Sequence, residues 1–95
     1  MYNEQELYTY IGKQIKHARH TTFEHRVMTQ TELAKAAGCT FQQIQKYERA
    51  TNKVSITKLG KIAQYTRKPL GYFIPNSVMN STTISSWQLP KYTYT

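Results

Sequence analysis

Glutamine amides and cations gather on one side of the segment from residue 41 to residue 49. On an α-helix, which advances about 100° per residue, one face would carry only these groups: Gln42, Gln45, Lys46 and Arg49. Ile44 and Tyr47 would lie on the opposite face, where we expect them to be buried. A glutamine amide can form two hydrogen bonds with adenine, and lysine or arginine can bind guanine or a backbone phosphate. The face therefore suits double-stranded DNA, although glutamine and lysine are also ordinary exposed helix formers.

Two helix starts, eleven residues apart, place this segment on the second of two short helices. Thr29 and Glu32 form one predicted capping box, and Thr40 and Gln43 form the other. In each box the threonine hydroxyl accepts a hydrogen bond from a backbone N–H of the first turn. Gly38 lies where a left-handed residue would end the first helix. The spacing predicts a helix-turn-helix, although the caps alone also fit an ordinary helical hairpin.

A longer helix is predicted before this pair. It begins at Asn3, with Glu6 completing a capping box and Tyr2 expected to pack against Leu7. Its inward side is an apolar stripe with helical spacing: Leu7, Ile11, Ile15 and Ala18.

Two more helices are predicted after the pair. One begins at Ser55, with four residues expected to face inward: Ile56, Leu59, Ile62 and Ala63. Pro69 can open a short last helix over residues 70–73, and Pro75 ends it. The predicted fold class is all-α, with residues 1–75 forming a compact five-helix bundle.

Several residues within this bundle have the spacing of a known family: Gln30, Leu33, Ala34, Gly38, Ile44, Tyr47 and Glu48. From Gly12 to about Pro75 the chain resembles the phage-repressor-like, or Xre, helix-turn-helix regulators, whose bundle is of the lambda-repressor-like type. The resemblance implies that residues of the second helix of the pair face the major groove: Phe41, Gln42, Gln43, Gln45 and Lys46. It also implies that Gln30 binds a backbone phosphate, and that Arg19 and Glu48 form a structural ion pair.

Further phosphate contacts are expected at both ends of this recognition helix. Thr40 lies at its start, and Arg49, Asn52 and Lys53 follow its end directly. Two features depart from the family pattern. The connection from Thr21 to Val27 is longer and lacks glycine, and no glycine follows the recognition helix, so Asn52 is the candidate for a left-handed residue there.

The chain is basic, and its charges are unevenly distributed. Its 95 residues and net charge of +8, with an isoelectric point near 9.8, predict one small domain with a polyanionic partner. All five acidic residues lie at or before Glu48, whereas seven cations follow it: Arg49, Lys53, Lys58, Lys61, Arg67, Lys68 and Lys91. An acidic membrane would also attract such a chain, but no helix has a basic face opposite apolar residues that the core does not need. We therefore expect no membrane partner.

The sequence contains no motif that indicates catalysis, cofactor binding or metal binding. No nucleophile motif, phosphate-binding glycine loop or suitable pair of carboxylates is visible. His17, His20, His25 and Cys39 match no zinc spacing, and Cys39 fits better as a small apolar filler between the paired helices. The single cysteine, the absence of a long apolar run and a start unlike a signal peptide predict a cytoplasmic protein. We expect neither an enzyme nor a cofactor.

Beyond residue 75 the composition changes. Residues 76–86 are rich in Ser, Thr and Asn, and isolated apolar residues follow: Trp87, Leu89, Tyr92 and Tyr94. The composition favours a partly ordered tail over residues 76–95. The aromatic residues are costly to expose, however, and they could fold back on the bundle, pair across a dimer or anchor another protein.

The combined prediction is a sequence-specific regulator of transcription that binds double-stranded DNA and acts as a repressor by occlusion. Such proteins normally form homodimers, so that two recognition helices meet successive major grooves about 34 Å apart. The alternative is a protein-interaction or antitoxin-like module that holds a protein partner through its tail. RNA fits less well, because no sheet with exposed aromatic residues is predicted.

Overall fold

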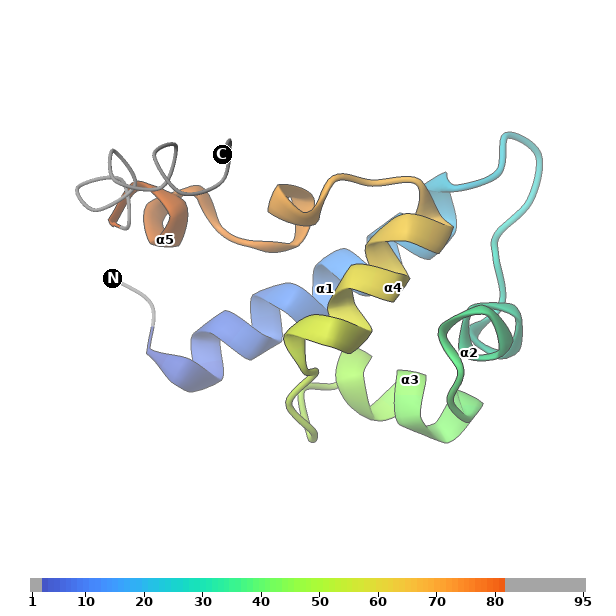
Figure 1. Ribbon diagram of the computed structural model, residues 1–95, viewed down its shortest axis with the longest axis horizontal. Helices are drawn as coiled ribbons and strands as arrows, with labels where there is room; N and C mark the ends of the chain where they lie inside the picture. The colour runs from blue at the N-terminus through green and yellow to red at the C-terminus, as the bar shows by residue number, and fades with distance from the viewer. Residues whose placement is uncertain (1–2, 82–95) are drawn as a thin grey trace, which may run out of the picture.

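The computed structural model describes residues 3–81 and is all-α within that range (Figure 1). Five α-helices and one 3-10 helix follow one another: α1 (Glu4–Thr21), α2 (Gln30–Ala37), α3 (Phe41–Glu48), α4 (Ile56–Thr66), η1 (Leu70–Phe73) and α5 (Asn76–Ser81). The predicted fold class is confirmed, as are the helices predicted from caps and periodicity. The expectations for Tyr2 and for the aromatic end of the tail lie outside the described residues.

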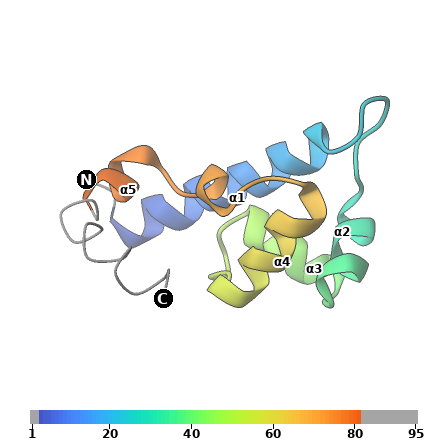
Figure 2. The ribbon, with the colours of Figure 1, turned by 45° about the horizontal axis from the view of Figure 1, so that its top comes forward.

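The helices pack around the long helix α1. The pair α2 and α3 packs together across its turn, α3 lies against α1, and α4 lies against α1 and α2 (Figure 1). The short η1 closes the bundle over α1 and α4, where the Gln14 side chain donates to the Tyr72 carbonyl at 2.9 Å. The turned view places α5 at the opposite end of the molecule from α2 (Figure 2). Helix α3 packs mainly against α1 and α2, and Phe41, Gln42 and Lys46 on its other side are exposed.

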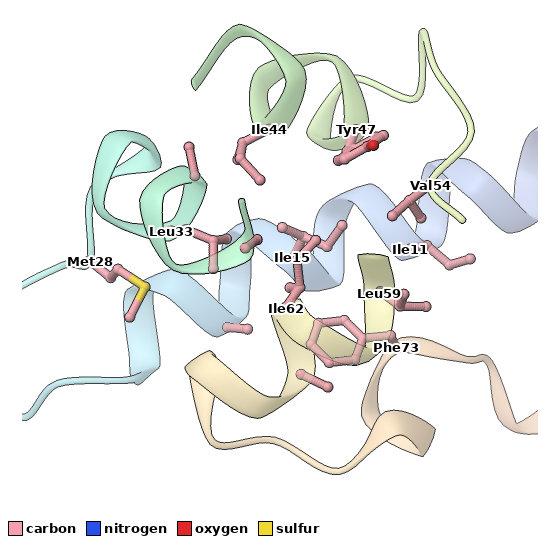
Figure 3. Packing of buried hydrophobic residues seen from close by; sticks show 14 residues of the cluster. Ile11, Ile15, Met28, Leu33, Ile44, Tyr47, Val54, Leu59, Ile62 and Phe73 are labelled. Atoms are coloured by element: carbon pink, nitrogen blue, oxygen red, sulfur yellow. The ribbon is translucent and has the colours of Figure 1, made fainter. Parts of the chain in front are cut away.

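The core lies where α1, α2, α3, α4 and η1 meet (Figure 3). Its centre is formed by apolar side chains with no exposed surface: Ile15, Leu33, Ile44, Ile62 and Phe73. Each side chain of this size stabilises the fold by about 1.5–3 kcal/mol when it is buried. Ile11 and Ala18 of the predicted α1 stripe are also buried, and Leu7 packs at the edge of the core.

Local capping bonds define the helix-turn-helix. The capping boxes predicted at the starts of α1 and α2 are complete. The Thr40 hydroxyl accepts from the Gln43 backbone N–H at 3.2 Å, although no return bond from the Gln43 side chain is found among the described residues. Gly38 ends α2 with φ 74°, as predicted. Lys58 of α4 donates to the Ala37 carbonyl at 2.8 Å, which ties the turn to α4.

Two expectations about the chain after α3 are wrong. The left-handed residue is Ala50, with φ 60°, rather than Asn52. Ile56 is 67% exposed rather than inward, because it is the first residue of α4 and the core-facing stripe begins one turn later. Thr66 extends that stripe at the other end of α4, where its buried hydroxyl donates to a carbonyl one turn earlier at 2.7 Å.

Helix α5 begins inside the segment whose composition suggested a tail. It follows Pro75, whose side chain is buried, and the Val78 backbone N–H donates to the Pro75 carbonyl at 3.0 Å. Proline suits a helix start because it has no N–H to leave without a partner.

The connection between α1 and α2 is held by a backbone hydrogen bond and by the contacts of Arg26, despite its length. The Met28 backbone N–H donates to the Arg19 carbonyl at 3.0 Å, and the Arg26 guanidinium lies 4.4 Å from the centre of the Phe23 ring. Arg26 also donates to both carboxylate oxygens of Glu32 at 2.7 Å. This hydrogen bond from Arg26, followed by one from the backbone at the start of α2, lowers the pKa of Glu32 to about 2.

Candidate nucleic-acid interface

Two buried side chains fix the rotation of α3 about its own axis. Ile44 has no exposed surface and Tyr47 is 8% exposed, and both point into the core (Figure 3). The remaining surface of α3 carries the residues predicted to face bases. Phe41, Gln42 and Lys46 are exposed, and Gln43 and Gln45 are half-buried. The structure therefore presents one aromatic ring, amides and a cation to solvent from a single helix.

Glu48, the acidic residue of α3, is turned away from this surface. Its carboxylate accepts from Arg19 Nε at 2.6 Å and from a terminal guanidinium nitrogen at 2.8 Å. The two side chains are 7% and 6% exposed, and Arg19 also donates to the Met28 carbonyl at 2.9 Å. The ion pair joins the end of α3 to α1 and leaves the exposed side of α3 without negative charge.

Gln30 lies between α2 and this ion pair. Its side chain is half-buried, and its amide nitrogen donates to Glu48 Oε1 at 3.1 Å. A glutamine amide carries two N–H groups, so one N–H of Gln30 has no partner among residues 3–81. The bond to Glu48 holds the Gln30 side chain in place before any ligand arrives.

The backbones of α1 and α3 approach each other closely at Gly12. A Cβ atom at this position would lie 2.5 Å from the Tyr47 carbonyl oxygen and 2.6 Å from that of Glu48. Glycine is therefore required for the depth at which α3 sits on α1. No local pattern singles out this glycine, because the contact joins residues far apart in the chain.

The predicted phosphate contacts are placed around both ends of α3. Thr40, Arg49, Asn52 and Lys53 are all exposed. The Thr51 and Asn52 backbone N–H groups donate to the Lys46 carbonyl at 3.0 and 3.4 Å, so they close the end of α3 rather than face a ligand.

Lys53 has a partner that sequence reasoning missed. Its Nζ lies 2.6 Å from Glu4 Oε1 in the first turn of α1, and both side chains are largely exposed. The hydrogen bond to Glu4 raises the pKa of the Lys53 amine above its ordinary value. A carboxylate is favourable in a first turn because it faces the positive end of the helix dipole, which was the available signal for Glu4. The residue predicted to bind phosphate thus already holds an anion.

Within residues 3–81, no group of three or more His, Cys, Asp or Glu side chains is placed to hold a metal ion. None of the helices in the described part of the chain is both long and apolar enough to cross a bilayer.

Known proteins are similar to this chain over the part that contains α2 and α3. The helix-turn-helix family HTH_3 matches residues 24–73. A protein of Sinorhizobium medicae, named as an uncharacterized HTH-type transcriptional regulator, is 42% identical over 50 residues, covering 53% of this chain and 36% of that protein. A similarly named protein of Sinorhizobium fredii is 35% identical over 69 residues, covering 73% of this chain and 46% of its own length.

A third relative, from Rhodospirillum rubrum, is named as an uncharacterized transcriptional regulator in the ATPase CF(0) region. It is 36% identical over 64 residues, covering 67% of this chain and 56% of that protein. The chain thus spans about a third to a little over half of the length of these relatives.

Proposed function

Because the chain belongs to the Xre-like helix-turn-helix family HTH_3, we propose that it is a sequence-specific regulator that binds double-stranded DNA. The observation that carries the proposal is the exposed side of α3, where Gln42 and Lys46 reach solvent while Ile44 and Tyr47 are buried. The relatives named as transcriptional regulators support a role in transcription. The protein acts by binding rather than by catalysis.

In this proposal α3 lies in the major groove with its first half toward the base edges. Gln42 and Gln45 can each make paired hydrogen bonds with adenine, and Lys46 can donate to guanine. The exposed ring of Phe41 can contact a thymine methyl group. Around this reading surface, backbone phosphates are bound by Gln30 on α2 and by the segment from Arg49 to Lys53 after α3.

The protein works as a homodimer in the cytoplasm and represses by occlusion. Two copies of α3 would meet successive major grooves about 34 Å apart on a near-palindromic site. A dimer bound across a promoter excludes RNA polymerase from the same stretch of DNA. The dimer is part of the proposal because one short helix reads too few base pairs to select a site in a genome.

The reading surface is tested with two substitutions. Gln42→Ala and Gln45→Ala are each expected to weaken binding to the preferred duplex by about 1–3 kcal/mol and to change binding to random duplexes little. The preferred duplex is first selected from a random pool, and binding is then measured by fluorescence anisotropy. Gln64→Ala, an exposed glutamine on α4, is the matched control. If both α3 variants bind the selected duplex like the wild type, this side of α3 is not the reading surface.

The Glu4–Lys53 pair allows a test with two opposite outcomes. Lys53→Ala is expected to weaken binding to every sequence alike and to reduce the slope of log K against log salt by about one unit. Glu4→Gln removes the competing carboxylate, so we expect it to tighten binding by about two- to fivefold at low salt. Both are measured as affinities between about 50 and 200 mM salt. If Lys53→Ala keeps the wild-type slope, Lys53 does not contact a phosphate. If Glu4→Gln binds more weakly than the wild type, Glu4 does not compete with the DNA but positions Lys53 for binding.

A further inference from the structure

A polar pocket of about 300 Å³ opens where α1, α2 and α3 meet, beside the reading surface. Its lining comes from all three helices and the residue after α3: Lys16, Arg19, Gln30, Gln45, Glu48 and Arg49. Lys16 lies on α1, outside the segment that matches the helix-turn-helix family.

The charges of this pocket leave two cations without an anion. Arg19 and Glu48 neutralise each other at 2.6 Å, and Gln30 donates to the same carboxylate. Lys16 and Arg49 are both exposed, and among residues 3–81 neither side chain has a hydrogen-bond or ion-pair partner. The pocket is therefore a polar hollow with two available cations in its lining, which suits an anion with several acceptor oxygens.

We propose that this pocket binds one phosphate of the DNA backbone and that Lys16 is a DNA-binding residue. The inference rests on the proposed function, because the anion it assigns is part of the duplex that α3 reads. Lys16 approaches the phosphate from α1 and Arg49 from the end of α3. The remaining N–H of Gln30 completes the set of donors.

The position of Gln45 explains what the pocket contributes. Gln45 belongs to the predicted reading surface and also lines the pocket, so a phosphate held there lies next to the bases that Gln45 can reach. Phosphate contacts fix the register and orientation of a protein on the duplex, whereas base contacts select the sequence. Lys16 thus sets the depth and tilt of α3 in the groove from a helix outside the helix-turn-helix.

The first experiment measures the salt dependence of duplex binding. Lys16→Ala is expected to reduce the slope of log K against log salt by about 0.9 and to weaken binding by about tenfold on selected and random duplexes alike. Lys16→Arg should retain the wild-type slope because it keeps the charge. Lys61→Ala, which removes an exposed lysine of α4 outside the pocket, is the matched control and should retain most of the slope.

The second experiment identifies the phosphate itself. Duplexes carrying a single neutral methylphosphonate are scanned along the selected site. In each half-site the wild type is expected to lose affinity at one position where the same modification does not change binding by Lys16→Ala or Arg49→Ala. Inorganic phosphate at constant ionic strength separates a free ion from the DNA backbone. Strong competition by millimolar phosphate that Lys16→Ala abolishes would assign the pocket to a free anion and overturn the proposal.

The outcomes distinguish the two proposals from each other. A wild-type slope in Lys16→Ala, together with loss of sequence preference in Gln42→Ala and Gln45→Ala, overturns the role of Lys16 and leaves the regulator intact. Absence of any preferred duplex for the wild type overturns the sequence-specific regulator, and absence of any duplex binding overturns both proposals. A third outcome also overturns the proposed pocket. Lys16→Ala could reduce the salt slope while Lys16→Ala and Arg49→Ala become insensitive to methylphosphonates at different positions. The two cations would then contact different phosphates.

Discussion

Glu48→Ala is expected to lower the free energy of unfolding by about 3–5 kcal/mol. The substitution removes the carboxylate that accepts two hydrogen bonds from Arg19 and one from Gln30. The Arg19 guanidinium, 7% exposed, would remain buried with only the Met28 carbonyl as an acceptor. Small domains are stable by only about 5–15 kcal/mol, so this single change removes a large share of the total. The loss is measured as a shift of the urea unfolding midpoint at constant slope.

Two further variants separate the buried charge from other causes. Glu24→Ala removes a carboxylate whose side chain is 90% exposed, and it should change stability by less than about 0.5 kcal/mol. The double variant Arg19→Met with Glu48→Leu replaces both charges with apolar groups and should recover most of the loss, because no unpaired charge stays buried. A loss below about 1 kcal/mol in Glu48→Ala would mean that Arg19 reaches water once its partner is gone.

Gly12→Ala is expected to destabilise the protein by about 1–3 kcal/mol, although alanine is a better helix former than glycine. The added Cβ would meet the Tyr47 and Glu48 carbonyl oxygens at 2.5 and 2.6 Å. Both atoms belong to the backbone, so no side chain can rotate away and α1 must separate from α3. Since α3 moves with this displacement, affinity for the selected duplex should fall even at temperatures where the variant is fully folded.

The second helical glycine of the bundle provides a control of opposite sign. Gly60 lies within α4, and a Cβ there would meet nothing within 4 Å. Gly60→Ala should therefore stabilise the protein by up to about 1 kcal/mol through helix propensity alone. Thermal unfolding resolves the pair, because about 1 kcal/mol shifts the midpoint of a domain this size by about 4–8 °C. Equal effects of the two substitutions would show that the α1–α3 contact adapts at little cost.

The sequence predicted the helices because their signals are local. A cap and its partner lie three residues apart, as at Thr29 and Glu32, and the α1 stripe repeats with the helical period. The exposed side of α3 followed from the same period once Ile44 and Tyr47 were placed in the core. Local signals failed where the surrounding structure decides the conformation. Ala50 is left-handed although such a residue costs about 1–2 kcal/mol, because backbone bonds from the residues that follow it hold the turn closed.

The rest of the site depends on contacts between distant parts of the chain. Glu4 and Lys53 are 49 positions apart, and nothing near either residue indicates the other. The close approach at Gly12 and the pocket beside Lys16 form only when α1 crosses the helix-turn-helix. A single sequence gives the face of each helix, whereas the relative placement of helices decides which of those faces share a ligand.

Three contacts hold α3 in place, and they have a consequence for the DNA that it would bind. Lys58 holds the turn before it, Arg19 holds its last residue and Gly12 sets its distance from α1. A helix held at three points can change its position only slightly when it enters a groove, so the DNA double helix must deform to fit it. The energy needed to deform DNA differs between stiff and easily deformed base steps. Under the proposed function, the protein should therefore discriminate among DNA sites at base pairs that none of its side chains touch.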